Sequence, residues 1–270
     1  MWERRYGLLE PQRTEGGFRL YSPADEERVR QMQRGIADGL PASLAAQRID
    51  LRSDTERQIF AGTSPPVIVR QLGDALGRFD ESTANTILDG ALAGLSLATV
   101  LDAVLLPYLQ DLGSRWERGE ISIGQEHFAT NIVRGRLLGL ARGWGAGSGL
   151  RALLACPPGE LHDLGLICFG LALREHGWRI VLLGPNTPIE TIRETAHGLG
   201  PAVVVVSSMS TPALEVVLDD LRALGASHRL MVAGPGATPG LADRVHGVYL
   251  ADSPTVAATR VIENVSGTSS

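Results

Sequence analysis

The sequence contains no lysine and only two cysteines. All 25 basic residues of the 270-residue chain are arginine, against 30 acidic residues, and the formal net charge is −5. A chain that is acidic as a whole is not a general polyanion binder, so any nucleic-acid surface must be local. Cys156 and Cys168 lie in apolar patterns and predict buried thiols in a reducing compartment rather than a zinc site. These features favour a cytoplasmic protein.

The sequence also lacks an apolar run long enough to cross a membrane, and its first residues do not form a signal peptide. Apolar residues make up 44% of the chain, which is enough for a substantial core. The length allows two domains, or one domain with a large annex.

The stretch from Cys156 to Gly165 reads Cys-Pro-Pro-Gly-Glu-Leu-His-Asp-Leu-Gly and follows an apolar, strand-like run. A histidine on a loop after a strand can reach over the sheet edge. A neighbouring carboxylate can then hold one ring nitrogen and leave the other free for a metal. Glu160 and His162 have this arrangement. The alternative is a loop histidine that is simply hydrogen-bonded to its neighbour.

The spacing Glu-x-His-x-x-Gly resembles the Asp-x-His-x-x-Gly signature of cobalamin-binding domains, in which the histidine is the lower ligand of cobalt. The resemblance implies that His162 is the metal ligand and that Glu160 is its hydrogen-bonding partner. It also implies that Gly165 lies where the corrin approaches the backbone. Glutamate in place of aspartate keeps the carboxylate and lengthens the arm.

Residues 1–21 contain two basic elements. Trp2–Tyr6 predicts the end of a helix closed by Gly7, and Gly16-Gly17 predicts a hairpin turn between two short strands. The landmarks Trp-Glu-x-Arg-Tyr-Gly and Arg-Thr-x-Gly-Gly-x-Arg-x-Tyr are similar to those of the winged-helix DNA-binding domain of MerR-family regulators. A solvated arginine-rich arm is the alternative. The DNA contacts that the resemblance implies are Arg4, Arg5, Tyr6, Arg13, Arg19 and Tyr21.

In that family a first helix and a turn precede the Trp-Glu landmark. We therefore expect residues 1–50 to be a truncated winged-helix domain, and the chain as written to bind operator DNA poorly. An upstream-extended form is expected to restore binding.

Residues 51–66 are polar and predict a linker, and residues 67–145 show helical periodicity. Short loops between the helices favour an antiparallel four-helix bundle, with a kink at Pro107. The predicted helices are Val67–Phe79, Glu81–Ala93, Ser96–Arg118 and Ile123–Gly143.

The predicted bundle carries Trp116, Glu126 and His127 in a Trp-x9-Glu-His spacing. This spacing resembles the helical cap of cobalamin-dependent photoreceptor regulators. The resemblance implies that Trp116 faces the upper ligand of the corrin, and that Glu126 and His127 hydrogen-bond the polar edge of that ligand. The alternative is a core tryptophan beside a surface Glu-His pair.

Residues 150–265 alternate between apolar strands and helical patterns, which predicts a parallel, doubly wound, Rossmann-like sheet of flavodoxin-like order 2-1-3-4-5. The predicted strands are Leu150–Ala155, Arg179–Leu183, Ala202–Ser207, Leu230–Ala233 and Val248–Ala251. Ser-x-Met and Gly-Pro-Gly replace the Ser-x-Leu and Gly-Gly of the cobalamin-binding pattern. The further residues predicted to contact the cofactor are Asp163, Gly184, Ser207, Met209, Gly234 and Gly236.

In this order, the three segments resemble the B12-dependent, light-responsive transcriptional regulators of MerR type. The resemblance implies adenosylcobalamin or methylcobalamin as cofactor, operator DNA as partner, and a cofactor-dependent homo-oligomer without enzymatic activity. The alternative is a corrinoid methyl-carrier protein that serves a methyltransferase, which would share the bundle and the cobalamin domain but lack a DNA-binding segment.

One position differs from the light-sensing relatives, in which the residue after the cap tryptophan is commonly histidine. Here it is Glu117. A carboxylate is a hard oxygen donor and is expected to bind cobalt less durably than imidazole. We also expect Arg115 or Arg118 to compete for this carboxylate.

Overall fold

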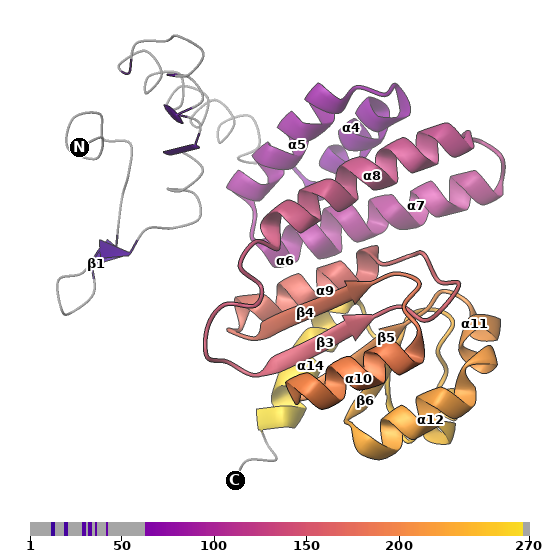
Figure 1. The fold of residues 1–270 in the computed structure, drawn as a ribbon. Coiled ribbons are helices and arrows are strands. Elements are labelled where there is room, and N and C mark those ends of the chain that lie inside the picture. The colour runs from indigo at the N-terminus through magenta and orange to yellow at the C-terminus, as the bar shows by residue number, and fades with distance from the viewer. Residues whose placement is uncertain are drawn as a thin grey trace. The chain divides into compact units, whose positions relative to one another are not determined.

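The computed structural model describes residues 63–266 without interruption, together with Gln12–Arg13, Arg19–Leu20 and scattered positions between residues 29 and 42. The chain forms two compact units. The first contains residues 1–64 and 86–95, and the second contains residues 65–85 and 96–270. Figure 1 shows the helices and the parallel sheet of the second unit.

In the first unit, β1 (Gln12–Arg13) pairs with β2 (Arg19–Leu20) in antiparallel orientation. Gln12 lies opposite Leu20, and Arg13 lies opposite Arg19. This pairing confirms the ribbon predicted around the Gly16-Gly17 turn. Four of the predicted DNA contacts lie outside the described residues, namely Arg4, Arg5, Tyr6 and Tyr21. The predicted helix end at Gly7 and the predicted linker up to residue 62 lie outside them as well.

All four helices predicted between residues 67 and 143 are present, although the third is divided and the fourth ends earlier. Within the second unit, the first helix packs against the third and fourth, which bury apolar side chains such as Leu72, Val104 and Val133. The helices are α4 (Pro65–Gly77), α5 (Glu81–Gly94), α6 (Leu97–Thr99), η1 (Val100–Leu105), α7 (Leu106–Glu117) and α8 (Ile123–Leu140).

The third predicted helix contains a π-helical segment, η1, which ends two residues before Pro107. The Leu106 N–H donates to the Leu101 carbonyl, five residues earlier. Proline has no N–H, and its ring crowds the carbonyl four residues before it, so a wider turn relieves the crowding at this point. The irregularity predicted at Pro107 therefore takes the form of a π-helical turn.

The sheet has five parallel strands in the order β4-β3-β5-β6-β7, which confirms the predicted order 2-1-3-4-5. The central strands β3 and β5 are buried along nearly their whole length, because helices cover both faces. The strands are β3 (Arg151–Ala155), β4 (Arg179–Gly184), β5 (Val203–Ser207), β6 (Leu230–Ala233) and β7 (Val248–Leu250).

Helices α9 (Leu164–Glu175) and α14 (Pro254–Ser266) lie side by side on one face of the sheet. All residues of α9 from Leu166 to Leu173 are buried, since the helix is packed between the sheet, α14 and the bundle helix α8. The opposite face packs in one apolar cluster with α10 (Ile189–Leu199), α11 (Thr211–Val216), α12 (Leu218–Ser227) and α13 (Pro239–Arg244). In the part of the chain that is described, no helix is long and apolar enough to span a membrane.

Candidate functional site: a buried carboxylate and an exposed histidine

The strand order changes direction between β3 and β5, and the loops that follow these two strands meet at that point. In open parallel sheets, ligands bind at such a switch point, beyond the carboxyl ends of the strands. The contact between the loops is a carboxylate: Glu160 Oε2 accepts hydrogen bonds from the Ser208 hydroxyl at 2.8 Å and the Met209 N–H at 2.6 Å.

The other oxygen of the same carboxylate holds the predicted histidine. Glu160 Oε1 accepts the His162 N–H at 2.9 Å and lies 2.7 Å from His162 Nδ1. Glu160 is only 3% exposed. Burial acts to raise the pKa of the Glu160 carboxyl, but the hydrogen bonds from the His162 N–H, the Ser208 hydroxyl, the His162 ring and the Met209 N–H outweigh it and lower the pKa below its ordinary value. The group is therefore an anionic acceptor at neutral pH.

An anionic acceptor at Nδ1 determines the state of the His162 ring. Nδ1 must carry the proton that is shared with Glu160, and the lone pair of a neutral ring is then on Nε2. The His162 side chain is 74% exposed. A neutral imidazole with one nitrogen held by a carboxylate and the other directed outward is the form that coordinates metals.

The loop that carries Glu160 is held by the loop after β4. The Asn186 N–H donates to the Glu160 carbonyl at 2.9 Å, and the Asn186 side chain accepts the Gly159 N–H at 2.9 Å. The Thr187 N–H donates to the Cys156 carbonyl at 2.9 Å. Burial raises the pKa of the Cys156 thiol to about 12, so this cysteine is a neutral packing group, as the sequence predicts.

Asp163 is buried beside His162 and pairs with the helical bundle. Arg134 on α8 donates through Nε at 3.0 Å to Oδ1 and through Nη2 at 2.7 Å to Oδ2. Asp163 also stands at the N-cap position of α9, yet its side chain accepts no hydrogen bond from that helix. The Asp163 carboxylate therefore binds Arg134 of the bundle instead of capping α9.

The predicted cap residues lie at the end of α7 and the start of α8. Trp116 is 48% exposed. His127 Nδ1 lies 2.6 Å from Glu126 Oε2, and Glu126 Oε1 accepts the Thr130 hydroxyl at 2.7 Å. Ser122 and Gln125 form a capping box at the start of α8, and the Gln125 amide donates to the Gly77 carbonyl on α4, which fixes this turn.

The structure thus brings Glu160, His162, Ser208 and Met209 together, with Asp163 beside them. Within the described residues, no hydrogen bond or ion pair joins the cap residues Trp116, Glu126 and His127 to these loops.

Comparison with known proteins covers nearly the whole chain. Models described as "B12 binding domain" match residues 68–138 and 150–251, and the model of the "MerR HTH family regulatory protein" matches residues 1–50. The HTH-type transcriptional repressor CarH of Myxococcus xanthus is 34% identical over 231 residues, which are 83% of this chain and 77% of that protein. The repressor CarA of the same organism is 31% identical and covers 87% of this chain and 81% of its own length.

The chain belongs to the MerR-type, B12-dependent transcriptional regulators. The solved structure of the monomethylamine corrinoid protein of Methanosarcina barkeri is 21% identical and covers 74% of this chain and 99% of its own, with a TM-score of 0.61. That likeness shows the fold alone. The regulator interpretation is therefore confirmed over the corrinoid carrier, and the cofactor class is cobalamin.

The surface around His162 suits the cofactor of this regulator family. Leu161 is 68% exposed and Met209 is 53% exposed, and both flank the carboxylate that holds the histidine ring. A large metal macrocycle could lie against these two apolar side chains, and the exposed imidazole of His162 would supply a single donor to its metal. A metal site built only from protein ligands would require more donors. Among the described residues, no group of three or more such side chains could hold an ion.

Two of the glycines predicted as cofactor contacts are also required by the packing of the protein itself. A Cβ on Gly234, whose φ is +86°, would lie 2.4 Å from the Ser208 carbonyl oxygen. A Cβ on Gly236 would lie 2.5 Å from the Ser210 carbonyl carbon, and the Gly236 N–H donates to the Ser208 carbonyl at 2.9 Å. Both glycines therefore allow close packing against the loop that supplies donors to Glu160. A Cβ on Gly165 would meet only Pro254, at 4.0 Å.

The expected competition of Arg115 and Arg118 for Glu117 does not take the form of an ion pair in the part of the chain that is described. Arg118 pairs with Glu120, its Nε lying 2.5 Å from Oε1, and Arg115 lies 3.7 Å from Asp111 and 3.9 Å from Glu120. Glu117 itself makes no ion pair within the part of the chain that is described. The Glu117 charge helps to raise the pKa of Arg118, but the hydrogen-bonded partner of this arginine is Glu120.

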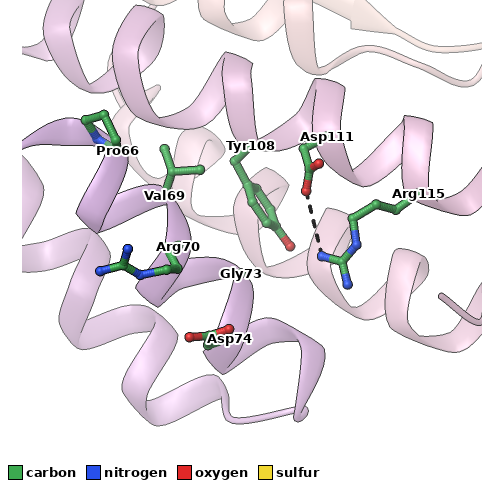
Figure 2. A pocket seen from close by; sticks show the side chains of 8 residues that line it. All are labelled: Pro66, Val69, Arg70, Gly73, Asp74, Tyr108, Asp111 and Arg115. Atoms are coloured by element: carbon green, nitrogen blue, oxygen red, sulfur yellow. Dashed lines mark ion pairs between the residues drawn. The ribbon is translucent and has the colours of Figure 1, made fainter. Parts of the chain in front are cut away.

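A surface pocket of about 270 Å³ lies between α4 and α7 of the bundle. Figure 2 shows Tyr108 between these helices, and the Asp111–Arg115 ion pair beside it. Burial raises the pKa of Tyr108, so its phenol is neutral. None of the residues predicted from the sequence to bind the cofactor lines this pocket; its lining residues are Pro66, Val69, Arg70, Gly73, Asp74, Tyr108, Asp111 and Arg115.

Sequence reasoning missed Ser208 and Arg134. Ser208 lies between the predicted Ser207 and Met209, but local spacing does not reveal which of adjacent polar residues turns inward. Arg134 is one of many arginines on a helix. Its only sequence signal is its position eight residues after Glu126, which places both on the same face of the helix.

The packing of Gly236 can be tested by substitution. Gly236→Ala should lower the free energy of unfolding by about 1–3 kcal/mol, because the new methyl group overpacks the backbone of Ser210. It should also weaken cobalamin binding by shifting the donors of Glu160. The matched control is Gly240→Ala in α13, where a Cβ meets nothing within 4 Å and stability should be unchanged or higher. Equal unfolding free energies for the two variants in denaturant titrations would contradict the packing argument.

Proposed function

We propose that this regulator binds a cobalamin with an adenosyl or methyl upper group, and that His162 is the lower ligand of the cobalt. Trp116, Glu126 and His127 surround the upper group. The state of the cofactor controls self-association of the chain and its binding to operator DNA, and the chain acts as a sensor rather than an enzyme.

The observation that carries this proposal is the orientation of the His162 ring by Glu160. A buried carboxylate that accepts four hydrogen bonds cannot turn without losing several donors. The imidazole is therefore presented in one tautomer and one direction before any ligand binds. Such preorganisation lowers the entropic cost of coordination.

When bound, cobalamin supplies a bond between cobalt and carbon that light can cleave. The chain supplies the surroundings of that bond. The Glu126–His127 pair offers polar groups on a helix turn that is fixed by the Ser122–Gln125 capping box. Trp116 offers an exposed aromatic face. Loss of the upper group removes what these side chains contact, and we infer that the bundle then shifts and changes the association of the chains.

The whole proposal is tested with the full chain and adenosylcobalamin. Molar mass by light scattering and operator binding at fixed salt should both differ between the apo, dark and illuminated samples. A chain whose mass and DNA affinity are the same in all three states would overturn it.

The first variant concerns the metal ligand. His162→Ala should lose the absorption change that accompanies histidine coordination, and it should weaken cobalamin binding, because it removes Nε2, the proposed cobalt ligand. The control is His197→Ala, which removes an exposed histidine on α10. Absorbance titration with adenosylcobalamin measures both effects. An unchanged spectrum and an unchanged cobalamin affinity in His162→Ala would show that His162 is not the lower ligand of the cobalt.

The second variant concerns the group that orients the histidine. Glu160→Gln keeps the shape but removes the charge, and one of its two terminal atoms becomes a donor that faces other donors. Losses of this kind are typically about 10–100-fold in metal affinity. The control is Glu190→Gln, an exposed carboxylate paired with Arg193. Equal cobalamin affinities for the two variants would show that Glu160 has no part in orienting His162.

The third variant concerns light. Because Glu117 is a weaker donor to cobalt than imidazole, illuminated wild type should lose its cobalamin on a desalting column more readily than Glu117→His. Glu117→Gln should behave like wild type. If wild type retains its cobalamin after illumination as well as Glu117→His does, the argument is wrong. If this retention disappears in His127→Ala, then His127 is the responsible position.

A further inference from the structure

An ion pair between the buried Asp163 and the partly exposed Arg134 joins the bundle to the histidine loop. Asp163 follows His162 directly and is 2% exposed, and Arg134 approaches it from α8 with two nitrogens. The Nε hydrogen of Arg134 is shared between the two oxygens, at 3.0 Å and 3.2 Å, and Nη2 lies 2.7 Å from Oδ2. This planar fork fixes the direction as well as the distance of the contact, which a lysine cannot do.

Arg134 stands on the same face of α8 as the cap residue Glu126. Glu126, Thr130 and Arg134 follow one another at four-residue intervals and therefore form one line along the helix. The Thr130 hydroxyl donates to Glu126 at 2.7 Å. This polar line begins at the Glu126–His127 pair and ends at the carboxylate next to His162.

We propose that Arg134 is a positioning residue that couples the bundle to the His162 loop, so that the docking of α8 and the presentation of His162 depend on each other. This inference rests on the proposed function of His162. It assigns to Arg134 and Asp163 a role between the upper-ligand cap and the lower-ligand loop.

The physical reason is the cost of a buried charge. When α8 moves away, Asp163 loses the guanidinium and remains as an unpaired carboxylate in a buried position. Such a change is strongly destabilising unless the group moves into water. Asp163 is joined to His162 by a single peptide bond, so its movement turns the loop in which His162 is held. Its N-cap position allows this, because no hydrogen bond from α9 holds the side chain back.

A second contact between bundle and sheet domain provides a matched control. The Thr255 hydroxyl, at the start of α14, donates to Asp102 in η1 at 2.6 Å. This bond also docks the bundle, but neither residue belongs to the loop of residues 156–163. Thr255→Val should therefore loosen the bundle near η1 without a direct effect on His162.

The experiment compares Arg134→Gln, Arg134→Lys, Asp163→Asn, the Arg134→Gln/Asp163→Asn double variant, and Thr255→Val with wild type. Adenosylcobalamin affinity is measured in the dark by absorbance titration. Hydrogen exchange of α8 and of residues 156–163 is measured without cobalamin. Arg134→Gln should weaken binding by about 10-fold or more and speed exchange in both segments, and Arg134→Lys should be intermediate. The double variant should be no weaker than Asp163→Asn, because the two residues act as a pair.

Several outcomes would overturn the inference. These are wild-type affinity and loop exchange in both Arg134 variants, additive losses in the double variant, or equal loop exchange in Thr255→Val and Arg134→Gln. If Arg134→Gln fails to fold, Arg134→Lys and Asp163→Asn provide the same comparison. His162→Ala separates the two proposals: if it weakens binding while the Arg134 variants do not, only the coupling fails, and if it has no effect, the assignment of His162 fails.

Discussion

The Glu160 carboxylate joins the two loops between which the sheet changes direction. A charge that is almost completely buried is costly unless it is paired or hydrogen-bonded, and here donors from both loops satisfy it. Because each donor depends on the position of its loop, the carboxylate makes the geometry of the two loops mutually dependent. The outward imidazole of His162 is a consequence of this arrangement, since its other nitrogen is one of the partners.

Glutamate, with its longer side chain, is consistent with this role. The side chain that starts on the loop after β3 reaches Ser208 and Met209 after β5, and still turns back to the ring two residues further along the chain. Gly234 and Gly236 support the arrangement from the loop after β6, because their missing side chains leave room for the backbone of Ser208 and Ser210. The donors of Glu160 thus depend on close packing that begins on a third strand.

Besides the packing of α8 against α9, two polar contacts join the helical bundle to the sheet domain. The Arg134–Asp163 fork ends next to the histidine, and the Asp102–Thr255 bond ends at α14. The π-helical turn before Pro107 contains Asp102, so the irregular segment of the bundle is also a point of attachment. Polar contacts of this kind are specific in direction and can be exchanged for water, as the bundle movement proposed above requires.

The arrangement of the sheet could be predicted from the sequence because each of its signals is local. Strands buried on both faces appear as short apolar runs, and glycine or proline marks their ends, so β3 to β7 were located to within about a residue. The pair Glu160 and His162 was also accessible, since a spacing of two residues on one loop brings the groups together. The helices of the bundle followed from their periodicity, although the π-helical turn did not, because it depends on backbone crowding at Pro107.

Only the tertiary structure decided which distant residues complete the site. Ser208 lies 48 residues after Glu160, and Arg134 lies 29 residues before Asp163. Which polar side chain turns inward at these distances depends on how the crossovers bring loops together and on which helix face docks. The ion-pair partner of Arg118 was likewise decided by the turn between α7 and α8, which brings the Glu120 carboxylate, rather than that of Glu117, to the guanidinium. Sequence by itself determined the family, the sheet and the histidine with its carboxylate. The donors that orient that carboxylate, and the arginine that ties the neighbouring Asp163 to the bundle, required the folded chain, because side chains distant in sequence become neighbours only through packing.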